Sequence, residues 1–244
     1  MNRLLLVFIT LCFALGAMGQ GQIKRPQKHM KQTSVKISTP DDYINGHGYV
    51  DLGLPSGTKW ATCNMGASNS YDFGKYYAWG ELLPRDSFYS DGTFHGVYPD
   101  LIKKGVYPSI VRNSIGGNSK FDAATVHWGK SWRIPSVSDF EELNKYCSWK
   151  FSTINGNNGY VVFGPNGKNI FLPLANGMCG TDNFMLNERA VYRTSDCKKS
   201  TGLRGGENWQ SVCFTLEKDE SFGEHRKLGT YPETNGFTIR PVTK

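Results

Sequence analysis

The cysteines have the widest chemical range in this chain, because a thiol serves as nucleophile, metal ligand or half of a disulfide. They are Cys12, Cys63, Cys147, Cys179, Cys197 and Cys213. Beyond Cys12, the closest two are Cys197 and Cys213, sixteen residues apart, and the chain has no Cys-x-x-Cys motif or neighbouring histidine to complete a zinc set. The spacing argues against a metal site, and we expect no metal and no cofactor.

The first twenty residues indicate the compartment, and with it the cysteine chemistry. MNRLLLVFITLCFALGAMGQ has a basic start at Arg3, an apolar run from Leu4 to Ala17, and small residues before Gln20. This layout is typical of a secretory signal peptide, which we expect over residues 1–19, and the run is too short to span a bilayer. No later segment suits a transmembrane helix. We expect an exported mature chain, in the periplasm, on the outer cell surface or in the medium.

In an exported chain, well-separated cysteines usually form disulfides. The five that follow the signal allow fifteen arrangements of two bridges and one free thiol, so the sequence leaves the connectivity open. We favour Cys63 with Cys147, which would tie a strand to the main helix and contribute up to about 4–5 kcal/mol. Cys197 with Cys213 would join neighbouring strands and contribute roughly 3 kcal/mol. Cys179 is then the odd thiol.

Other catalytic and metal-binding patterns are weak. The chain has no Gly-x-Ser-x-Gly elbow and no His-Glu-x-x-His helix. His127, beside Trp128, is a residue type that serves as a general base, but a packed or surface histidine is far more common. Asp72, Glu81 and Asp122 could bind Ca²⁺, yet no run of alternating acidic ligands appears, so loop hydrogen bonds and helix capping are preferred. The sequence predicts no catalytic residue.

The formal net charge of +7 is unevenly distributed. Residues 23–36 include five basic side chains, and no acidic residue precedes Asp41. Such a segment suits an acidic partner such as anionic lipid or polysaccharide. The preferred interpretation is a solvated basic tether over residues 20–45. Nucleic acid is not an expected partner, because the rest of the chain mixes both signs and the protein is exported.

Strand patterns dominate the chain. Apolar alternation over residues 50–54 predicts a strand, the turn Pro55–Gly57 follows, and TKWATC predicts the returning strand. GYVVF and NIFLPL flank Gly-Pro-Asn-Gly, a strong hairpin signal. Strands are also expected in AVYRTSD, WQSVCFTL and GFTIRPV. Residues 66–117, rich in turn-forming residues, predict a long ordered loop with at most one short strand near residues 76–79.

Two segments predict helices. Asp122 is placed to cap a short helix in FDAATVHWG. In RIPSVSDFEELNKYCSW, Ser136 is the expected N-cap of the main helix, with Asp139 in the capping-box position. Phe140 and Leu143 fall on one face of this helix, which therefore packs against a core.

Several of these motifs together resemble the Fibrobacter succinogenes major paralogous domain family. They are YVDLGLPSGTKWATCNMGA, YYAWGE, FDAATVHWGKSWRIPSVSDFEEL, GPNGKNIFLPLA and GFTIRPV, and they extend from about Gly46 to Val242. The resemblance implies an exported protein of a kind abundant in Bacteroidetes. It also implies a single α+β domain over residues 46–244, with the C-type-lectin-like fold shared with formylglycine-generating enzymes. That fold has a mixed, mainly antiparallel sheet, one or two helices and long ordered loops.

The resemblance also bears on the bridges and on the variable part of the chain. It implies the pairing of Cys63 with Cys147. The last third departs from the family, since VYRTSDC replaces a strand that resembles YWSS, and Cys179, Cys197 and Cys213 are local additions. Functions that the family performs through this region are therefore the ones that this chain is least expected to share.

The tryptophans divide into two groups. Those within or beside the family motifs are assigned to the core, and they are Trp60, Trp79, Trp128, Trp132 and Trp149. Trp209 lies outside the motifs, in GLRGGENWQ. With Arg204 and Asn208 it is the predicted ligand-contact site, because aromatic and arginine side chains dominate binding surfaces. Packing of Trp209 within a strand pair is the alternative.

These observations predict an exported, non-enzymatic recognition or surface-structural domain. A disulfide-tied scaffold would present variable loops between residues 176 and 209 to a glycan or protein ligand at the cell surface. The first alternative is an oxidase-like enzyme related to formylglycine-generating enzymes, which needs two nearby thiols at a copper site. The second is a subunit of a surface assembly without a small ligand.

Overall fold

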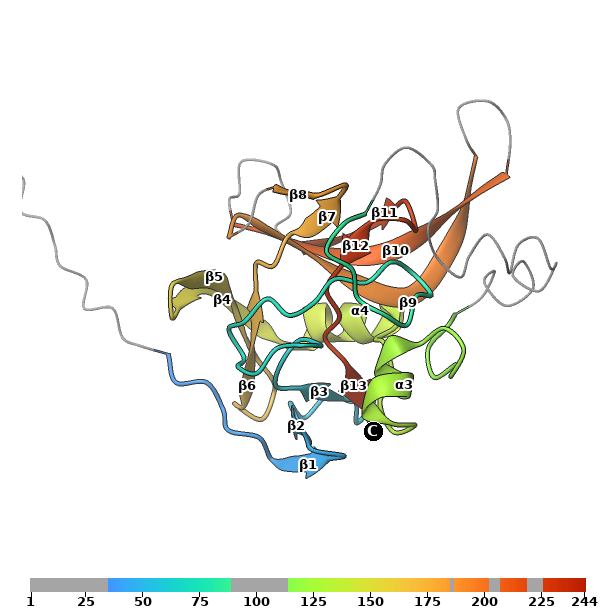
Figure 1. Ribbon diagram of the computed structural model, residues 1–244. Coiled ribbons are helices and arrows are strands. Elements are labelled where there is room, and N and C mark those ends of the chain that lie inside the picture. Colours follow the sequence, from blue (N-terminus) through green and yellow to red (C-terminus); the bar gives the residue numbers. More distant parts are fainter. Residues whose placement is uncertain (1–34, 89–113, 185–186, 202–206, 219–225) are drawn as a thin grey trace, which may run out of the picture. The chain divides into compact units, whose positions relative to one another are not determined.

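Short strands make up most of the computed structural model, which describes residues 35–88, 114–184, 187–201, 207–218 and 226–244 (Figure 1). The helices are α3 (Ala123–Trp128) and α4 (Val137–Tyr146). The strands are β1 (Asp42–Ile44), β2 (His47–Val50), β3 (Lys59–Ala61), β4 (Ser148–Ile154), β5 (Asn157–Phe163), β6 (Asn169–Pro173), β7 (Gly177–Cys179), β8 (Asp182–Phe184), β9 (Arg189–Thr201), β10 (Glu207–Glu217), β11 (Arg226–Tyr231), β12 (Gly236–Phe237) and β13 (Val242–Thr243).

Within the described residues, the strands form small antiparallel sheets. One has four strands in the order β1-β2-β3-β13, and the others have three, in the orders β11-β10-β9, β12-β7-β8 and β4-β5-β6. The last strand of the chain, β13, pairs with β3, so the two ends of the described domain lie in one sheet. The predicted α+β class is confirmed at this level, as strand-rich antiparallel sheets with two short helices among the described residues.

Both helices begin as their caps predict. The Asp122 side chain accepts a hydrogen bond from the Thr125 backbone N–H at the start of α3. At the start of α4, Ser136 and Asp139 form a reciprocal capping box. Arg133 also donates to both carboxylate oxygens of Asp139, at 2.6 and 2.9 Å, and this pair lowers the pKa of that buried carboxyl below its ordinary value against the opposing effect of burial.

An aromatic cluster forms the core beneath α4, which lies against β9 and β10. The Phe140 ring stacks on Phe214 with centroids 4.6 Å apart and meets Trp60 edge to face at 5.1 Å. A second cluster gathers Trp79, Trp128 and Trp132. The predicted core role of the tryptophans is confirmed for Trp60, Trp79, Trp128 and Trp132, which are buried, whereas Trp149 is half-buried against the first cluster.

A fully buried cation connects the end of β3 to β6. The Arg240 guanidinium donates to the backbone oxygens of Ala61, Thr62 and Phe171 and to the side-chain oxygen of Asn64, at 2.7–3.1 Å. These carbonyl dipoles take the place of water around the buried charge. They hold the segment that follows β3 against the β4-β5-β6 sheet.

The ordered domain begins before the predicted boundary at Gly46. The compact unit starts at Val35, and β1 pairs with β2 around Asn45 and Gly46, both in the left-handed backbone region at φ 51° and 81°. This geometry is the type I′ hairpin turn that Asn-Gly favours. The last residues of the predicted tether are therefore part of the folded domain.

Other sequence expectations meet mixed outcomes. The hairpin around Gly164–Gly167 is confirmed as β5 and β6. The short strand expected near residues 76–79 is only an isolated bridge between Tyr77 and Phe237, and residues 89–113 of the expected loop lie outside the described part. Strand β4 has no counterpart in the sequence expectations. In the described part of the chain, neither helix has the length and apolarity needed to cross a membrane.

Candidate functional site

The structure places no disulfide bond between any of the five cysteines after the expected signal, all of which lie in the described part of the chain, so neither predicted disulfide is present. Cys147 caps the end of α4 and packs against the first core cluster. Cys63 instead lines a surface cavity beyond the end of β3. The pairing of Cys63 with Cys147 therefore stays a prediction from sequence, for which the structure supplies no bond.

The register of β9 and β10 separates the second predicted pair. Cys197 lies opposite Ser211, whereas Cys213 lies opposite Arg193, because β9 carries extra residues in an irregularity between these positions. Cys213 is buried in a cluster with Val191 and Phe237, and Cys197 packs against the Trp79 cluster. The two cysteines lie on neighbouring strands, as expected, but they are not opposite each other in the register, and their disulfide stays a prediction from sequence.

Burial makes three of these thiols poor nucleophiles. It raises the pKa of Cys147 to about 11, with Glu142 adding to the effect, and that of Cys197 to about 12, with Glu233 and Asp196 adding to it. Burial also raises the pKa of Cys213. Because the thiolate is the reactive form, these sulfurs are suited to structural roles.

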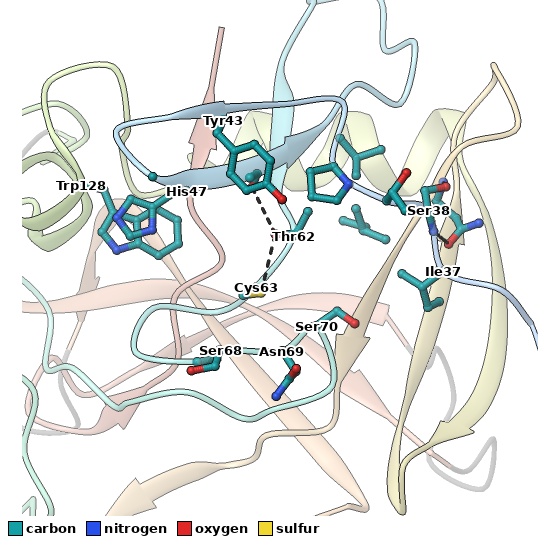
Figure 2. Close-up of a pocket in the computed structure, with 18 residues that line it drawn as sticks. Ile37, Ser38, Tyr43, His47, Thr62, Cys63, Ser68, Asn69, Ser70 and Trp128 are labelled. Carbon is teal, nitrogen blue, oxygen red and sulfur yellow. Dashed lines mark hydrogen bonds between the residues drawn. The ribbon is translucent and has the colours of Figure 1, made fainter.

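A hollow with a volume of about 610 Å³, which we call the hairpin cavity, lies beside the β1–β2 hairpin (Figure 2). Its wall combines the segment before β1, the hairpin itself, the loop after β3, the end of α3 and the start of β6. The lining residues are Ile37, Ser38, Thr39, Pro40, Tyr43, Gly46, His47, Gly48, Val50, Thr62, Cys63, Ala67, Ser68, Asn69, Ser70, Trp128, Asn169 and Ile170. Cavities of this size accommodate small ligands.

Aromatic rings form one part of this wall. His47 stacks on Trp128 with ring centroids 3.8 Å apart and planes 8° from parallel, and Figure 2 shows the two rings superposed at one end of the cavity. Burial lowers the pKa of His47 from its ordinary 6.5, so the imidazole is neutral at pH 7. Tyr43 is 61% exposed and carries a third ring at the cavity.

Backbone contacts fix the hairpin that carries these rings. Asn45 donates from its side chain to the Trp128 carbonyl oxygen at 2.8 Å, and Trp132 donates from its indole N–H to the Ile44 carbonyl oxygen at 3.1 Å. A Cβ atom at Gly48 would lie 2.9 Å from the ring of Pro40, so this glycine allows the preceding segment to pack on β2. The aromatic wall is thereby held in place before any ligand arrives.

Hydroxyl and amide groups form the facing wall. Ser68, Asn69 and Ser70 lie across the cavity from Tyr43, with Thr62 and Cys63 between them (Figure 2). The Asn69 side-chain N–H donates to Asp72 at 3.0 Å, which leaves its carbonyl oxygen as an acceptor. Within the described residues, no hydrogen bond engages the Ser68 and Ser70 hydroxyls. These groups can therefore donate to and accept from a ligand.

The described lining contains no aspartate, glutamate, lysine or arginine. No group of three or more metal-ligating side chains gathers anywhere in the described part of the chain. Cys63 and His47 share the cavity, but the sulfur's hydrogen-bond contact is with its neighbour Thr62, 3.6 Å away, rather than with the imidazole. The nucleophile–base contact that thiol catalysis requires is therefore missing between these two residues.

The predicted ligand-contact residues belong to the β9–β10 strand pair or lie outside the described residues. Asn208 and Trp209 are on β10, opposite Ser200 and Lys199 in the register, and Arg204 lies outside the described residues. Their predicted role in binding stays a prediction.

The candidate calcium ligands and the candidate base have local structural roles. Asp72 accepts from the backbone and side chain of Asn69, Glu81 pairs with Arg85, and Asp122 caps α3. The Nε2 atom of exposed His127 lies 2.7 Å from the Leu82 carbonyl oxygen. The contacts of the three carboxylates are loop hydrogen bonds, an ion pair and a helix cap. They agree with the preferred interpretation of these residues.

Sequence reasoning missed the cavity residues, although one signal was present. Asn45-Gly46 is a strong hairpin motif, and it directly places Tyr43 and His47 on paired strands. No comparable signal marks Ser68, Asn69 and Ser70. Their position opposite the aromatic rings depends on the path of the loop after β3.

Comparison with known proteins yields no match: no family model, no curated protein and no solved structure is significantly similar to this chain.

Proposed function

We propose that this chain is an exported, non-enzymatic recognition domain that binds an uncharged saccharide unit in the hairpin cavity. The observation that carries the proposal is the composition of that cavity. About 610 Å³ is bounded by stacked and exposed aromatic rings and by hydroxyl and amide groups, with no charged side chain in the described lining.

This composition matches the chemistry of a sugar ring. A saccharide has an apolar C–H face that packs on aromatic rings, and its hydroxyl groups each donate and accept hydrogen bonds. Tyr43 and His47 supply ring surface, and the wall of Ser68, Asn69 and Ser70 supplies hydroxyl and amide partners. A charged group buried here would lose hydration without a counter-charge, which favours a neutral occupant.

Export and family membership belong to the same proposal. The segment 1–19 has the layout of a signal peptide, and the motifs from Gly46 onward resemble the Fibrobacter succinogenes major paralogous domain family. Small antiparallel sheets with two helices among the described residues support a C-type-lectin-like arrangement at the level of fold class. Recognition of a cell-surface or environmental glycan is the function that such an exported domain would serve.

The decisive experiment measures saccharide binding by the mature chain and by the Tyr43→Ala variant. Calorimetry and saturation-transfer NMR with neutral gluco-, manno-, galacto- and xylo-tetrasaccharides identify the sugar that binds. We expect Tyr43→Ala to weaken binding of that sugar at least about tenfold, the loss typical of an aromatic anchor. Because Tyr43 is exposed, its loss should leave stability almost unchanged.

Tyr146→Ala is the matched control, because Tyr146 is also an exposed tyrosine, 43% accessible, but lies on α4 outside the cavity. Binding by this variant should equal that of the unmodified chain. The proposal fails if none of the tetrasaccharides binds, or if the two tyrosine variants lose affinity equally.

The oxidase-like alternative requires two thiols that act together at copper. In the described lining of the hairpin cavity, Cys63 is the single cysteine, and burial raises the pKa of Cys147, Cys197 and Cys213. The free Cys63 thiol is the observation that keeps this alternative worth an assay. Copper-dependent thiol oxidation with turnover, lost in Cys63→Ser, would favour the oxidase over the recognition domain.

A further inference from the structure

A second, smaller cavity adjoins the hairpin cavity, and its charge is different. Its volume is about 300 Å³, and we call it the lysine cavity. It is lined by Lys36, Ile37, Ser38, Thr39, Asp41 and Lys168. Residues 37–39 line both cavities, so one short segment of backbone forms the wall between them. An extended ligand could therefore occupy the two together.

Asn169 holds this shared wall in place. The Ser38 backbone N–H donates to the Asn169 side-chain oxygen at 3.2 Å, and the Asn169 backbone N–H donates to the Ser38 hydroxyl at 3.0 Å. The Asn169 side-chain N–H also donates to the Lys36 carbonyl oxygen at 3.3 Å. Asn169 is buried, so these bonds are shielded from competing water. The position of Lys36 relative to both cavities is thereby fixed at its backbone.

The lysine cavity has an excess of positive charge. The Lys168 ammonium lies 2.6 Å from one oxygen of Asp41, and the other oxygen accepts from the Asp51 backbone N–H at 2.8 Å. Both oxygens of the lining carboxylate are therefore engaged, and the exposed ammonium of Lys36 has no ion-pair partner in the described part of the chain. Two lysines against one aspartate leave one net positive charge on this wall.

We propose that the ligand is an acidic oligosaccharide, with an uncharged unit in the hairpin cavity and the anionic group of the neighbouring unit at Lys36 and Lys168 in the lysine cavity. This inference rests on the proposed function and specifies its ligand class. The shared chemistry is a carboxylate or a sulfate on a sugar. The uncharged lining excludes the anion from the larger cavity, and the unneutralised lysine receives it in the smaller one.

The experiment compares matched charged and uncharged probes. Partly methyl-esterified tetragalacturonate is titrated against its fully esterified form, and a partly sulfated galactan tetrasaccharide against its desulfated form. We expect one charged probe to bind at least about tenfold more tightly than its neutral counterpart at low ionic strength, with the preference reduced in 0.5 M NaCl. The pair that shows the preference identifies carboxylate or sulfate as the anion.

Lys36→Gln should lower affinity for the charged probe roughly fivefold, the size expected of one exposed ion pair, and leave the neutral probe unaffected. Lys168→Gln should act in the same direction. Lys150→Gln is the matched control, because Lys150 is exposed on β4 and lies outside both cavities.

The outcomes separate this inference from the function on which it depends. If neutral and charged probes bind equally and both require Tyr43, the hairpin cavity binds sugar and the acidic-ligand inference is wrong. If Lys36→Gln and Lys150→Gln weaken the charged probe equally, general surface charge explains the preference and the lysine cavity is not a site. If no probe binds, both proposals are overturned.

Discussion

The most direct energetic test of this structure is the replacement of Glu233 by glutamine. Glu233 follows β11, and its backbone oxygen accepts from the Trp79 N–H at 2.9 Å. Burial raises the pKa of its carboxyl from an ordinary 4.5 to about 7, although the guanidinium of Arg193 acts in the opposite direction. The Glu233 carboxylate also interacts with the Cys197 thiol, whose pKa it raises. The Arg193 guanidinium interacts with the Glu81 carboxylate as well, whose pKa it lowers. Glutamine keeps the shape of the protonated acid and removes its ability to ionise.

The sign of the effect follows from linkage. Because the folded-state pKa lies above the unfolded value, the fold binds this proton more tightly than the unfolded chain does. Below pH 4.5 the carboxyl is protonated in both states, and Glu233 does not lower the stability of the fold. The loss of stability grows as the pH rises from 4.5 toward 7, and it reaches its full size above pH 7. The two pKa values differ by about 2.5, and each pKa unit corresponds to about 1.36 kcal/mol, so ionisation of Glu233 lowers the free energy of unfolding by about 3 kcal/mol.

The assay is urea unfolding of both proteins, followed by tryptophan fluorescence at pH 4.5, 6 and 8. We expect Glu233→Gln to be about 3 kcal/mol more stable than the unmodified chain at pH 8 and nearly equal to it at pH 4.5. Comparing the two proteins at each pH cancels the titration of all other groups. Glu188→Gln is the control, because this exposed carboxylate pairs, among the described residues, with exposed Lys218 and should change stability by less than about 1 kcal/mol.

Two results would refute this reasoning. If Glu233→Gln gained the same stability at pH 4.5 and at pH 8, the gain would not come from removing the ionised carboxylate. A loss of stability at pH 8 would mean that attraction between the Glu233 carboxylate and Arg193 exceeds the cost of removing the charge from water.

Two further predictions concern the core and the thiols. Phe140→Ala should lower the free energy of unfolding by about 3–5 kcal/mol, because the ring is fully buried and stacked on Phe214, whereas Phe151→Ala, at a 38% exposed ring, should cost far less in the same urea assay. Iodoacetamide treatment of the native, unreduced protein, followed by peptide mass mapping, should label Cys63 in its cavity and leave buried Cys213 unmodified. Protection of Cys63 until a reductant is added would instead support the disulfide predicted from sequence.

Local motifs were predictable because their physics lies within a few residues. The cap at Asp122, the capping box of Ser136 with Asp139 and the Gly164–Gly167 turn depend on hydrogen bonds and backbone angles that the segment itself supplies. The alternation of strands with glycine-rich turns indicated the class in the same way. Strand β4 was not predicted from the sequence, because its exposed residues, such as Lys150 and Phe151, break the apolar alternation that marks a half-buried strand.

The candidate sites were decided by tertiary structure. The hairpin cavity joins residues from the segments 37–50, 62–70 and 169–170 with Trp128. These segments meet through tertiary contacts such as the β2–β3 pairing, the carbonyl contacts of buried Arg240 and the hydrogen bonds of Asn169. The hydrophobic periodicity of the sequence does not indicate which distant segments come together at a cavity.

The cysteines show the same division between sequence and fold. Their number and spacing, read from the chain alone, argued against a metal site, but which sulfur lies in a cavity and which is buried depends on strand register. A single irregularity in β9 places Cys197 opposite Ser211 rather than Cys213. Sequence by itself determined where the chain turns, caps and alternates, since those preferences are local. Tertiary structure determined which distant side chains share a surface, because that depends on the simultaneous packing of every element.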